Sequence, residues 1–402
     1  MLLYHYTARE TSTGQTIKAT VQADSEAGAA AAIRKEGLVP LSIKAEGSGG
    51  LSSVLKGRIK IKEKVLFSRQ LSTLINAGLP LVQALRNVSA QTQNKPLKVV
   101  IEQVIADVEA GSSLSKSLAK HPNVFNQIYI SLVEAGETSG TLDKSLERLA
   151  VQQEKDADVI SKVRGAFVYP IIVLCVMVGV VIFMLLKVLP QVQVLYDGLE
   201  GATLPFFTRL LLGVSDAIKN FWWAIIIAFG VIGFFMTRWA RTGPGKQAVD
   251  KFKLKAPLIG PLFMKMYMAR FARTGSTLIA SGVPLIQMLE ITASAVNNVH
   301  VAASLHKAAE KVKGGKALSD TLTGDPNFLE LVPSMLHIGE ESGSTEQMLA
   351  KTADYYEKEV DDQIKAISTI IEPLLMVLMG VVALIIVAAV LLPVYSLSGD
   401  SF

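Results

Sequence analysis

The stretch FSRQLSTLINAGLPLVQAL, residues 67–85, returns in similar form as FARTGSTLIASGVPLIQML at residues 271–289. The two stretches agree at 11 of 19 positions, and the shared residues include an Arg, a Gly, a Pro and a Gln in the same register. Two unrelated apolar helices can resemble each other in composition. Such a resemblance would not place Arg, Gly, Pro and Gln at the same positions in both. The similarity therefore indicates an internal duplication with a period of about 204 residues.

The duplication continues along the chain. VEAGSSLSKSLAKHPNVF (108–125) matches VKGGKALSDTLTGDPNF (312–328), and GETSG (136–140) matches GEESG (339–343). Further on, two prolines of the first copy, at 170 and 190, correspond to prolines 373 and 393 of the second. Each repeat is thus a mixed polar and apolar region followed by one apolar block.

Three apolar blocks are long enough to cross a lipid bilayer. Residues 166–186 and 373–393 contain no charged residue, and residues 221–237 form a shorter block at the lower end of what a span requires. Trp222, Trp223 and Trp239 lie at the two ends of the shorter block, where an interfacial aromatic belt would lie. We expect three transmembrane helices.

Lysine and arginine in the flanking segments indicate the orientation, because these residues are enriched on the cytoplasmic side. Seven of them lie between positions 238 and 265, whereas the 191–218 segment holds Arg209 against three acidic residues. We therefore expect the N-terminal 165 residues and the region after the second span to be cytoplasmic. Two repeats in the same orientation need a return helix between them, and the middle block supplies it.

The sequence thus predicts an all-α integral membrane protein with two homologous cytoplasmic helical bundles, three transmembrane helices and a small N-terminal α/β module. The predicted domains in chain order are the α/β module 1–46, a linker 47–59, bundle 1 at 60–165, transmembrane helix 1 at 166–190, a periplasmic loop 191–218, transmembrane helix 2 at 219–238, a basic cytoplasmic connector 239–263, bundle 2 at 264–368, transmembrane helix 3 at 369–393 and a periplasmic tail 394–402.

Glycine and proline positions predict the helix ends within the bundles. Gly78 fits the residue just after a helix, and Pro80 fits the first turn of the next helix. Thr141 and Ser344, which follow the two Gly-Glu motifs, are placed to cap the helices after them. Ser344 also has capping-box spacing to Gln347. The apolar blocks place Pro170 and Pro373 early in their spans, where a missing backbone donor costs least.

No motif for catalysis is present. GPGKQ (243–247) differs from a phosphate-binding loop, because Ala240 stands where a glycine is needed and Gln247 where Ser or Thr is needed. The histidines have no metal-binding spacing near a carboxylate, and the single cysteine, Cys175, lies in an apolar block that keeps it inert. We expect no catalytic residue, no cofactor and no metal ion.

The two Gly-Glu motifs are the candidate partner-docking elements. Three interpretations are open: a turn whose Glu favours the positive end of the next helix, a docking loop, or a cation site. The candidate residues are Gly136, Glu137, Gly140, Gly339, Glu340 and Gly343.

The stretch KVRGAFVYPIIVLCVMVGVVIFMLLKVLP (162–190) resembles the signature of the inner-membrane platform protein of type II secretion and type IV pilus assembly. The paired AGLPL and SGVPL turns and the N-terminal ADSEAGAAAAIRKEGLVPL are similar to the same family. The second repeat departs from the signature, because Glu372 replaces the Tyr before the Pro; a snorkelling or capping role and a proton-relay role are both open for it. The signature residues are Lys162, Tyr169, Pro170, Pro190, Glu372, Pro373 and Pro393.

The resemblance implies a non-enzymatic component of the bacterial inner membrane, with a cytoplasmic N-terminus and a periplasmic C-terminus. Its implied partners are a hexameric assembly ATPase facing the cytoplasmic bundles, other inner-membrane assembly proteins, pilin or pseudopilin transmembrane helices, the lipid bilayer and further copies of the chain. No nucleic acid partner is expected. The ATPase would drive insertion of pilin subunits into a growing fibre.

The main alternative is a subunit of a membrane transporter with internal repeats, although such repeats usually lie within many spans. A membrane-anchored sensor would call for a larger segment outside the membrane. The sequence does not separate pilus, secretion and competence systems.

Overall fold

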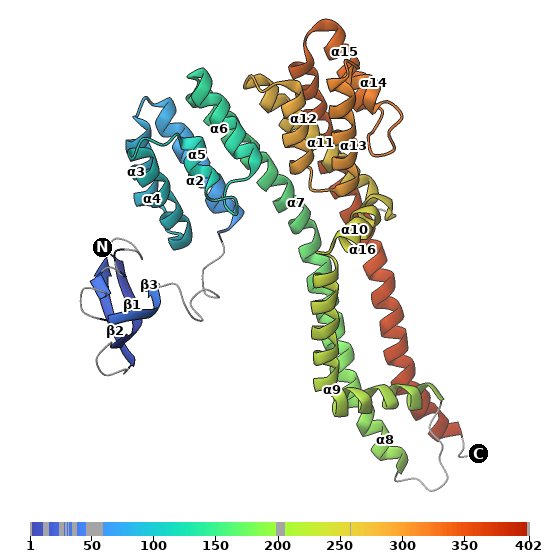
Figure 1. The fold of residues 1–402 in the computed structure, drawn as a ribbon. Coiled ribbons are helices and arrows are strands. Elements are labelled where there is room, and N and C mark those ends of the chain that lie inside the picture. Colours follow the sequence, from blue (N-terminus) through green and yellow to red (C-terminus); the bar gives the residue numbers. More distant parts are fainter. Residues whose placement is uncertain are drawn as a thin grey trace. The chain divides into compact units, whose positions relative to one another are not determined.

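The computed structural model describes residues 2–10, 16–23, 28, 30, 32–33, 38–45, 59–197, 206–257 and 259–399. Its contacts divide the chain into two compact units: residues 1–63 with 89–103, and residues 64–88 with 104–402. Among the described residues, strands occur only in the N-terminal segment and the rest is helical (Figure 1). The predicted linker 47–59 lies almost wholly outside the described residues.

The N-terminal segment forms a three-stranded antiparallel sheet. Its strands are β1 (Leu2–Glu10), β2 (Thr16–Ala23) and β3 (Leu38–Ala45), in the order β2-β1-β3. Ala8 of β1 and Ile33 are buried together. The helix predicted after β2 falls mostly on residues outside those described, so the α/β character of this module stays a prediction.

The two repeats contain the same series of helices. In the first repeat these are α2 (Ile61–Asn76), α3 (Leu81–Gln91), α4 (Lys95–Glu109), α5 (Leu114–Ala119), α6 (Gln127–Ser139) and α7 (Leu142–Phe183). Their counterparts are α11 (Gly260–Ala280), α12 (Leu285–Ala295), α13 (Val299–Lys313), α14 (Leu318–Leu322), α15 (Leu331–Ser342) and α16 (Thr345–Gly399). Since α3 and α12 both have 11 residues and α4 and α13 both have 15, the duplication predicted from the sequence extends to the lengths of the helices.

Glycines in the left-handed conformation end the first helix of each repeat, as predicted. Gly78 has φ +85° and Gly282 has φ +83°, and after each the next N–H bonds back to a carbonyl five residues earlier. Such a turn satisfies the carbonyls that a helix end leaves free. Pro80 lies one position earlier than predicted: the next helix begins at Leu81, and the Pro80 carbonyl accepts its first bond, from Ala84 N–H at 2.9 Å.

The last helix of each bundle continues into an apolar segment without a break. α7 has 42 residues and α16 has 55, and both contain a candidate membrane span. Pro170 and Pro373 lie early in the apolar blocks, as predicted, but the helices begin at Leu142 and Thr345, so the expectation that a missing donor costs little there is not met. Each proline removes a backbone donor in a helix interior, where the loss is usually costly.

The segment between the first two spans is largely helical where it is described, and not the loop that was predicted. A π-helical turn, η2 (Met184–Val188), follows α7 and leads into α8 (Leu189–Asp197). Helix α9 (Phe206–Trp239) begins before the predicted second span and has a non-helical residue, Phe221, inside it. Likewise, the predicted tail belongs to α16 as far as Gly399.

The basic connector contains helix α10 (Gly243–Lys255) and the start of α11. GPGKQ opens α10, with Thr242 capping it through Gly245 N–H. Asp250 is buried, pairs with Lys253 at 3.0 Å and accepts a bond from Val299 N–H at the start of α13. The connector is thus attached to bundle 2.

Candidate functional site: the two bundles and the joint between them

An aromatic pair lies at the same place in each bundle. The rings of Phe67 and Phe125 are 5.7 Å apart, and those of Phe271 and Phe328 are 5.4 Å apart. Tyr129 adds a third ring in the first bundle, 4.9 Å from Phe125, and burial raises the pKa of its hydroxyl. Tilted and edge-on ring pairs stabilise a core beyond their buried area.

An arginine–glutamate pair is also duplicated and ties the first helix of each repeat to its last. Arg69 of α2 binds Glu154 of α7 through two bonds, and the bond with Glu154 raises the pKa of the guanidinium. In the second repeat Arg273 of α11 binds Glu357 of α16 at 2.7 Å. A guanidinium matches a carboxylate geometrically in a way that lysine does not.

The glutamates of the two Gly-Glu motifs cap short helices within their own bundles. Glu137 accepts bonds from the N–H groups of Leu114 and Ser115, at the start of α5. Glu340 accepts the equivalent bonds, from Leu318 at 2.6 Å and Ser319 at 3.2 Å, at the start of α14. A carboxylate at a helix N-terminus satisfies free donors and complements the helix dipole. The predicted positive helix end is therefore present, but it belongs to the preceding short helix and not to the following one.

The glycines of these motifs let the last two helices of each bundle pack closely. A Cβ atom on Gly136 would lie 2.6 Å from Ser145 Oγ, and one on Gly339 would lie 2.8 Å from the Thr345 Cα. Both glycines lie inside helices, α6 and α15, so the predicted loops are in fact last helical turns. Only the second glycines, at 140 and 343, form the turn, with φ of +71° and +66°.

The predicted side-chain caps after these turns are wrong. Thr141 makes no capping bond to α7; its hydroxyl bonds Ser139 Oγ at 2.7 Å. Ser344 likewise bonds Ser342 Oγ at 2.6 Å. The two Gly-Glu motifs thus act as structural elements of the bundles, and their role as docking residues stays a prediction. In the described part of the chain no three potential metal ligands gather.

The two repeats meet where α7 packs against α11 and α16, a contact that we call the joint. Lys155 of α7 pairs with Glu357 at 3.2 Å, and Lys162 pairs with Asp361 at 2.7 Å. Arg148 donates to the Ala280 carbonyl and, at 3.3 Å, to Ser281 Oγ. Partly exposed ion pairs contribute only about 0–1 kcal/mol each to stability. These contacts therefore add more to the specificity of the pairing between the repeats than to its stability.

The apolar part of the joint supplies most of its stability. A buried cluster of the second repeat, Leu262, Val360, Ile364 and Ile367, receives Val159, Val163 and Ala166 of α7. The three α7 side chains are partly buried, so each contributes a part of the roughly 1.5–3 kcal/mol that full burial of such a side chain supplies. Several such contacts therefore outweigh the surrounding ion pairs.

The joint is asymmetric, and the sequences of the two repeats differ accordingly. From Gly136/Gly339 to Pro170/Pro373 the repeats align with a constant shift of 203 residues, since 339 − 136 = 373 − 170 = 203. At the positions of Val360, Ile364 and Ile367 the first repeat has Ala157, Ser161 and Arg164. At those of Val159, Val163 and Ala166 the second repeat has Asp362, Ala366 and Thr369, all exposed. Apolar residues thus occur where the joint is formed and polar or small ones where it is not.

Among the signature residues that the structure describes, Lys162 contributes an ion pair to the joint. Tyr169 and its counterpart Glu372 are exposed on the apolar parts of α7 and α16, as is Pro373, while Pro170 is buried. Pro190 is the second residue of α8, after Leu189. Only the backbone of Pro393, inside α16, is described. Sequence reasoning missed the joint itself, although comparing the two repeats position by position would have revealed it.

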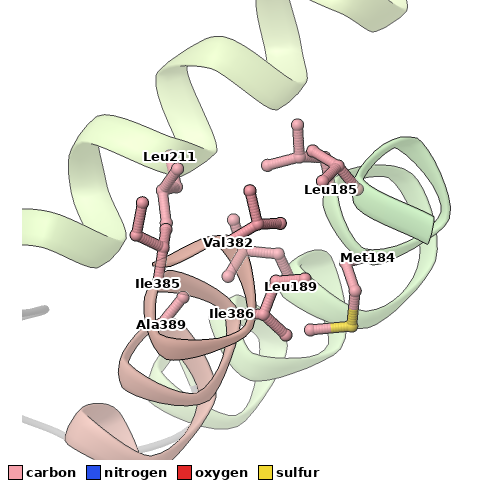
Figure 2. Close-up of a pocket in the computed structure, with 9 residues that line it drawn as sticks. Met184, Leu185, Leu189, Leu211, Val382, Ile385, Ile386 and Ala389 are labelled. Atoms are coloured by element: carbon pink, nitrogen blue, oxygen red, sulfur yellow. The ribbon is translucent and has the colours of Figure 1, made fainter. Parts of the chain in front are cut away.

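A small apolar pocket of about 150 Å³ lies between the ends of the apolar helices that point away from the bundles (Figure 2). Leu185 and Leu189 face it from η2 and α8, Leu211 from α9, and Ile385 and Ala389 from α16. Beside it, the buried hydroxyl of Ser215 donates to the Leu185 carbonyl at 2.5 Å. In a π-helical turn that carbonyl would bond the N–H of residue 190, which is a proline and has none. Ser215 therefore compensates for the missing donor.

The geometry defines a class of protein: a duplicated helical bundle in which each copy continues into its own apolar helix, with a third apolar helix between them. Residues 67–190 and 271–393 each match the family model described as type II secretion system (T2SS), protein F, and residues 1–44 match the N-terminal domain of type II secretion system protein F. The chain belongs to this family. The resemblance seen in the sequence and the duplication are thereby confirmed.

Relatives carry two kinds of name. The chain is 39% identical over 406 residues to the type IV pilus assembly protein PilC of Thermus thermophilus, covering 99% of both chains. It is 35% identical over 366 residues to PilC of Pseudomonas aeruginosa, covering 91% of this chain and 97% of the relative. It is also 35% identical over 406 residues to the type II secretion system protein F of Pseudomonas aeruginosa, covering 99% of both. Overall identity therefore does not separate the two systems.

The capping role of the Gly-Glu motif predicts a difference between two neighbouring glutamates. Glu340→Ala leaves two N–H groups of α14 without their acceptor and should lower stability by about 1–2 kcal/mol. Glu341→Ala removes only an exposed contact with His337, at 3.3 Å, and should have little effect. Thermal unfolding of the two purified variants in detergent measures the difference; equal melting temperatures would contradict the assignment.

The asymmetry of the joint predicts the outcome of a reciprocal exchange between the repeats. Ile364→Ser installs the residue of the first repeat in a buried cluster and should cost about 2–4 kcal/mol. The mirror change, Ser161→Ile, lies on an exposed face and should cost less than about 0.5 kcal/mol. The same experiment can follow the Lys155–Glu357 contact by carbodiimide cross-linking, which Ile364→Ser should weaken. A joint that tolerates both changes equally would refute this account.

Proposed function

We propose that the chain is a non-enzymatic inner-membrane platform protein of a type IV pilus or type II secretion machine. In this role it couples a cytoplasmic assembly ATPase to the insertion of pilin or pseudopilin subunits into a growing fibre. The single observation that carries the proposal is the match of both repeats to the protein F family, in the order in which the chain presents them. The names of its relatives, pilus assembly and type II secretion, support the setting.

The proposed orientation places both bundles, the N-terminal module and the basic connector in the cytoplasm. Residues 191–218 and the C-terminal end then face the periplasm. The cluster of Lys and Arg between 238 and 265 supports this direction, because such clusters are retained in the cytoplasm. With three spans, both repeats reach the same side.

The continuous helices α7 and α16 support mechanical coupling. At about 1.5 Å per residue, 42 and 55 residues extend over roughly 63 and 83 Å, more than twice the thickness of a hydrocarbon core. A force on a bundle is then transmitted to its span without a flexible connection between them. The joint keeps the two bundles moving together.

The proposed partners follow from this arrangement. The ATPase would contact the cytoplasmic bundles, with the two Gly-Glu turns as candidate contacts, and pilin helices and other assembly proteins would contact the spans. Further copies of the chain are proposed partners as well. The transporter alternative has no support from the family match. The sequence offers no catalytic motif, which supports a non-enzymatic role.

Deletion of the gene tests the role as a whole. We expect loss of surface fibres, of twitching motility or of secreted proteins, depending on the system, while the ATPase remains present. Re-expression of the intact chain should restore the lost property. Survival of all three properties in the deletion strain would refute the proposal.

Mechanical coupling predicts the effect of a flexible insertion in α7. Gly-Ser-Gly placed after Gly165 leaves the joint residues up to Val163 in position but interrupts the helix before its span. We expect normal amounts of protein in the membrane and fibre assembly or secretion reduced to background. The same triplet after Gly49, in the predicted linker, is the matched control and should be tolerated. Full activity with the α7 insertion would show that a rigid helix is not required.

A further inference from the structure

Helix α9 is too long to be one membrane span. Its 34 residues extend over about 51 Å at 1.5 Å per residue, whereas a hydrocarbon core is about 30 Å thick. The helix is also interrupted: Phe221 has φ −119° and ψ 17°, outside the helical region. In Figure 1 the first part of α9 runs crosswise to the second part.

Tryptophans mark the two ends of the second half. Trp222 and Trp223 directly follow the interruption and Trp239 ends the helix, and all three are exposed. The 18 residues from 222 to 239 extend over about 27 Å, which matches the hydrocarbon core. Tryptophan prefers the two membrane–water interfaces. Residues 222–239 are therefore the span, and the residues before Phe221 start at the level of an interface.

The first half of α9, residues 206–220, has three different faces. One face is buried: Thr208, Leu212 and Ser215 are covered, and Leu212 packs with Leu185, Leu189 and Ala389 at the ends of the other apolar helices. A second face carries Arg209, Asp216 and Asn220, which are exposed.

The third face is apolar and exposed. Phe206 is 77% exposed, Leu210 55% and Val214 44%, and they recur every four residues. We call these three residues the apolar stripe. Phe221, itself 56% exposed, leads from the stripe to the apolar surface of the span. Exposing such an apolar stripe to water is unfavourable. The stripe is also continuous with the surface of the span, which lipid covers.

We propose that residues 206–220 form an in-plane helix, which lies in the interface of the bilayer leaflet farther from the bundles. Protein covers one face, lipid the apolar stripe, and water the edge that carries Arg209 and Asp216. Helices with an apolar and a polar face commonly lie in this plane. The partner of the stripe is thus the lipid itself, in a segment that the sequence alone indicates to be a loop.

The packing keeps this helix beside the span ends. Leu211 lines the apolar pocket of Figure 2, and Ser215 bonds the carbonyl left free by Pro190. The in-plane helix is therefore a fixed part of the membrane domain, joined to α7, η2 and α16 through the same residues that enclose the pocket. The proposal depends on the three spans and not on the ATPase or on the direction of the chain.

Site-directed labelling tests the proposal with the full chain. In a Cys175→Ala background, one cysteine is placed at Leu210 or Val214 in the stripe, or at Asp216 or Asn220 on the polar edge. The purified proteins are reconstituted in vesicles of phosphatidylethanolamine and phosphatidylglycerol, which are opened by freeze–thaw with a water-soluble maleimide present. Because the reaction requires a thiolate in water, we expect the stripe positions to react about tenfold more slowly than the polar-edge positions. Wild-type protein, with only the mid-span Cys175, is the unlabelled control.

A second measurement uses the same four positions and separates protection by lipid from protection by protein. A fluorophore at Leu210 or Val214 should be quenched by lipids that carry a nitroxide near the headgroup, and one at Asp216 or Asn220 should be quenched much less. Equal, rapid labelling at all four positions, without quenching, would show a helix standing in water. No labelling at any of them would show a segment inside the hydrocarbon core. Either result would overturn the proposal, whatever the outcome of the gene-deletion experiment.

Discussion

A peptide group inside a bilayer finds no water to bond, so a chain crosses as a complete helix and each crossing changes its side. This constraint determines the rest of the architecture. A repeat that ends in a span leaves the chain on the far side, and a second repeat of the same orientation needs a return helix first. The unpaired helix α9 between the two copies meets that need. Its proposed in-plane first half follows from its length together with the interruption at Phe221, because 34 residues exceed what one crossing uses and the helix is broken before the tryptophans.

Duplication alone would give both bundles the same two joint surfaces. Each copy could then bind the next one head to tail without limit. The two copies avoid this by divergence at few positions. Ile364 faces α7 where the first repeat has Ser161, and Val159 faces the second repeat where the copy has Asp362. Meanwhile the internal contacts of each bundle, such as Arg69 with Glu154 and Arg273 with Glu357, are kept in both. The interior thus repeats, and the outer face specifies a single pairing.

Much of the fold could be predicted from the sequence, because its signals are local or repeated. The apolar blocks, the left-handed glycines and the internal match each depend on a short stretch of residues. What could not be predicted depends on contacts distant in sequence: Glu137 caps a helix more than twenty residues earlier, and Ser215 compensates for Pro190. The continuous α7 was missed because Pro170 suggested a helix start, whereas the helix runs through it from Leu142 to Phe183. The two glutamates became candidates for docking because they occur in both repeats. Their capping of α5 and α14 explains this repetition equally well.

The central claim is that both bundles lie on one side of the membrane, each continuous with its own span. Paired reporter fusions test it most directly, with alkaline phosphatase or a fluorescent protein inserted after Lys116 in the first bundle, after Lys313 in the second and after Asp197 between them. The account predicts fluorescence and no phosphatase activity at Lys116 and Lys313, and the reverse at Asp197. Opposite results at Lys116 and Lys313 would contradict it.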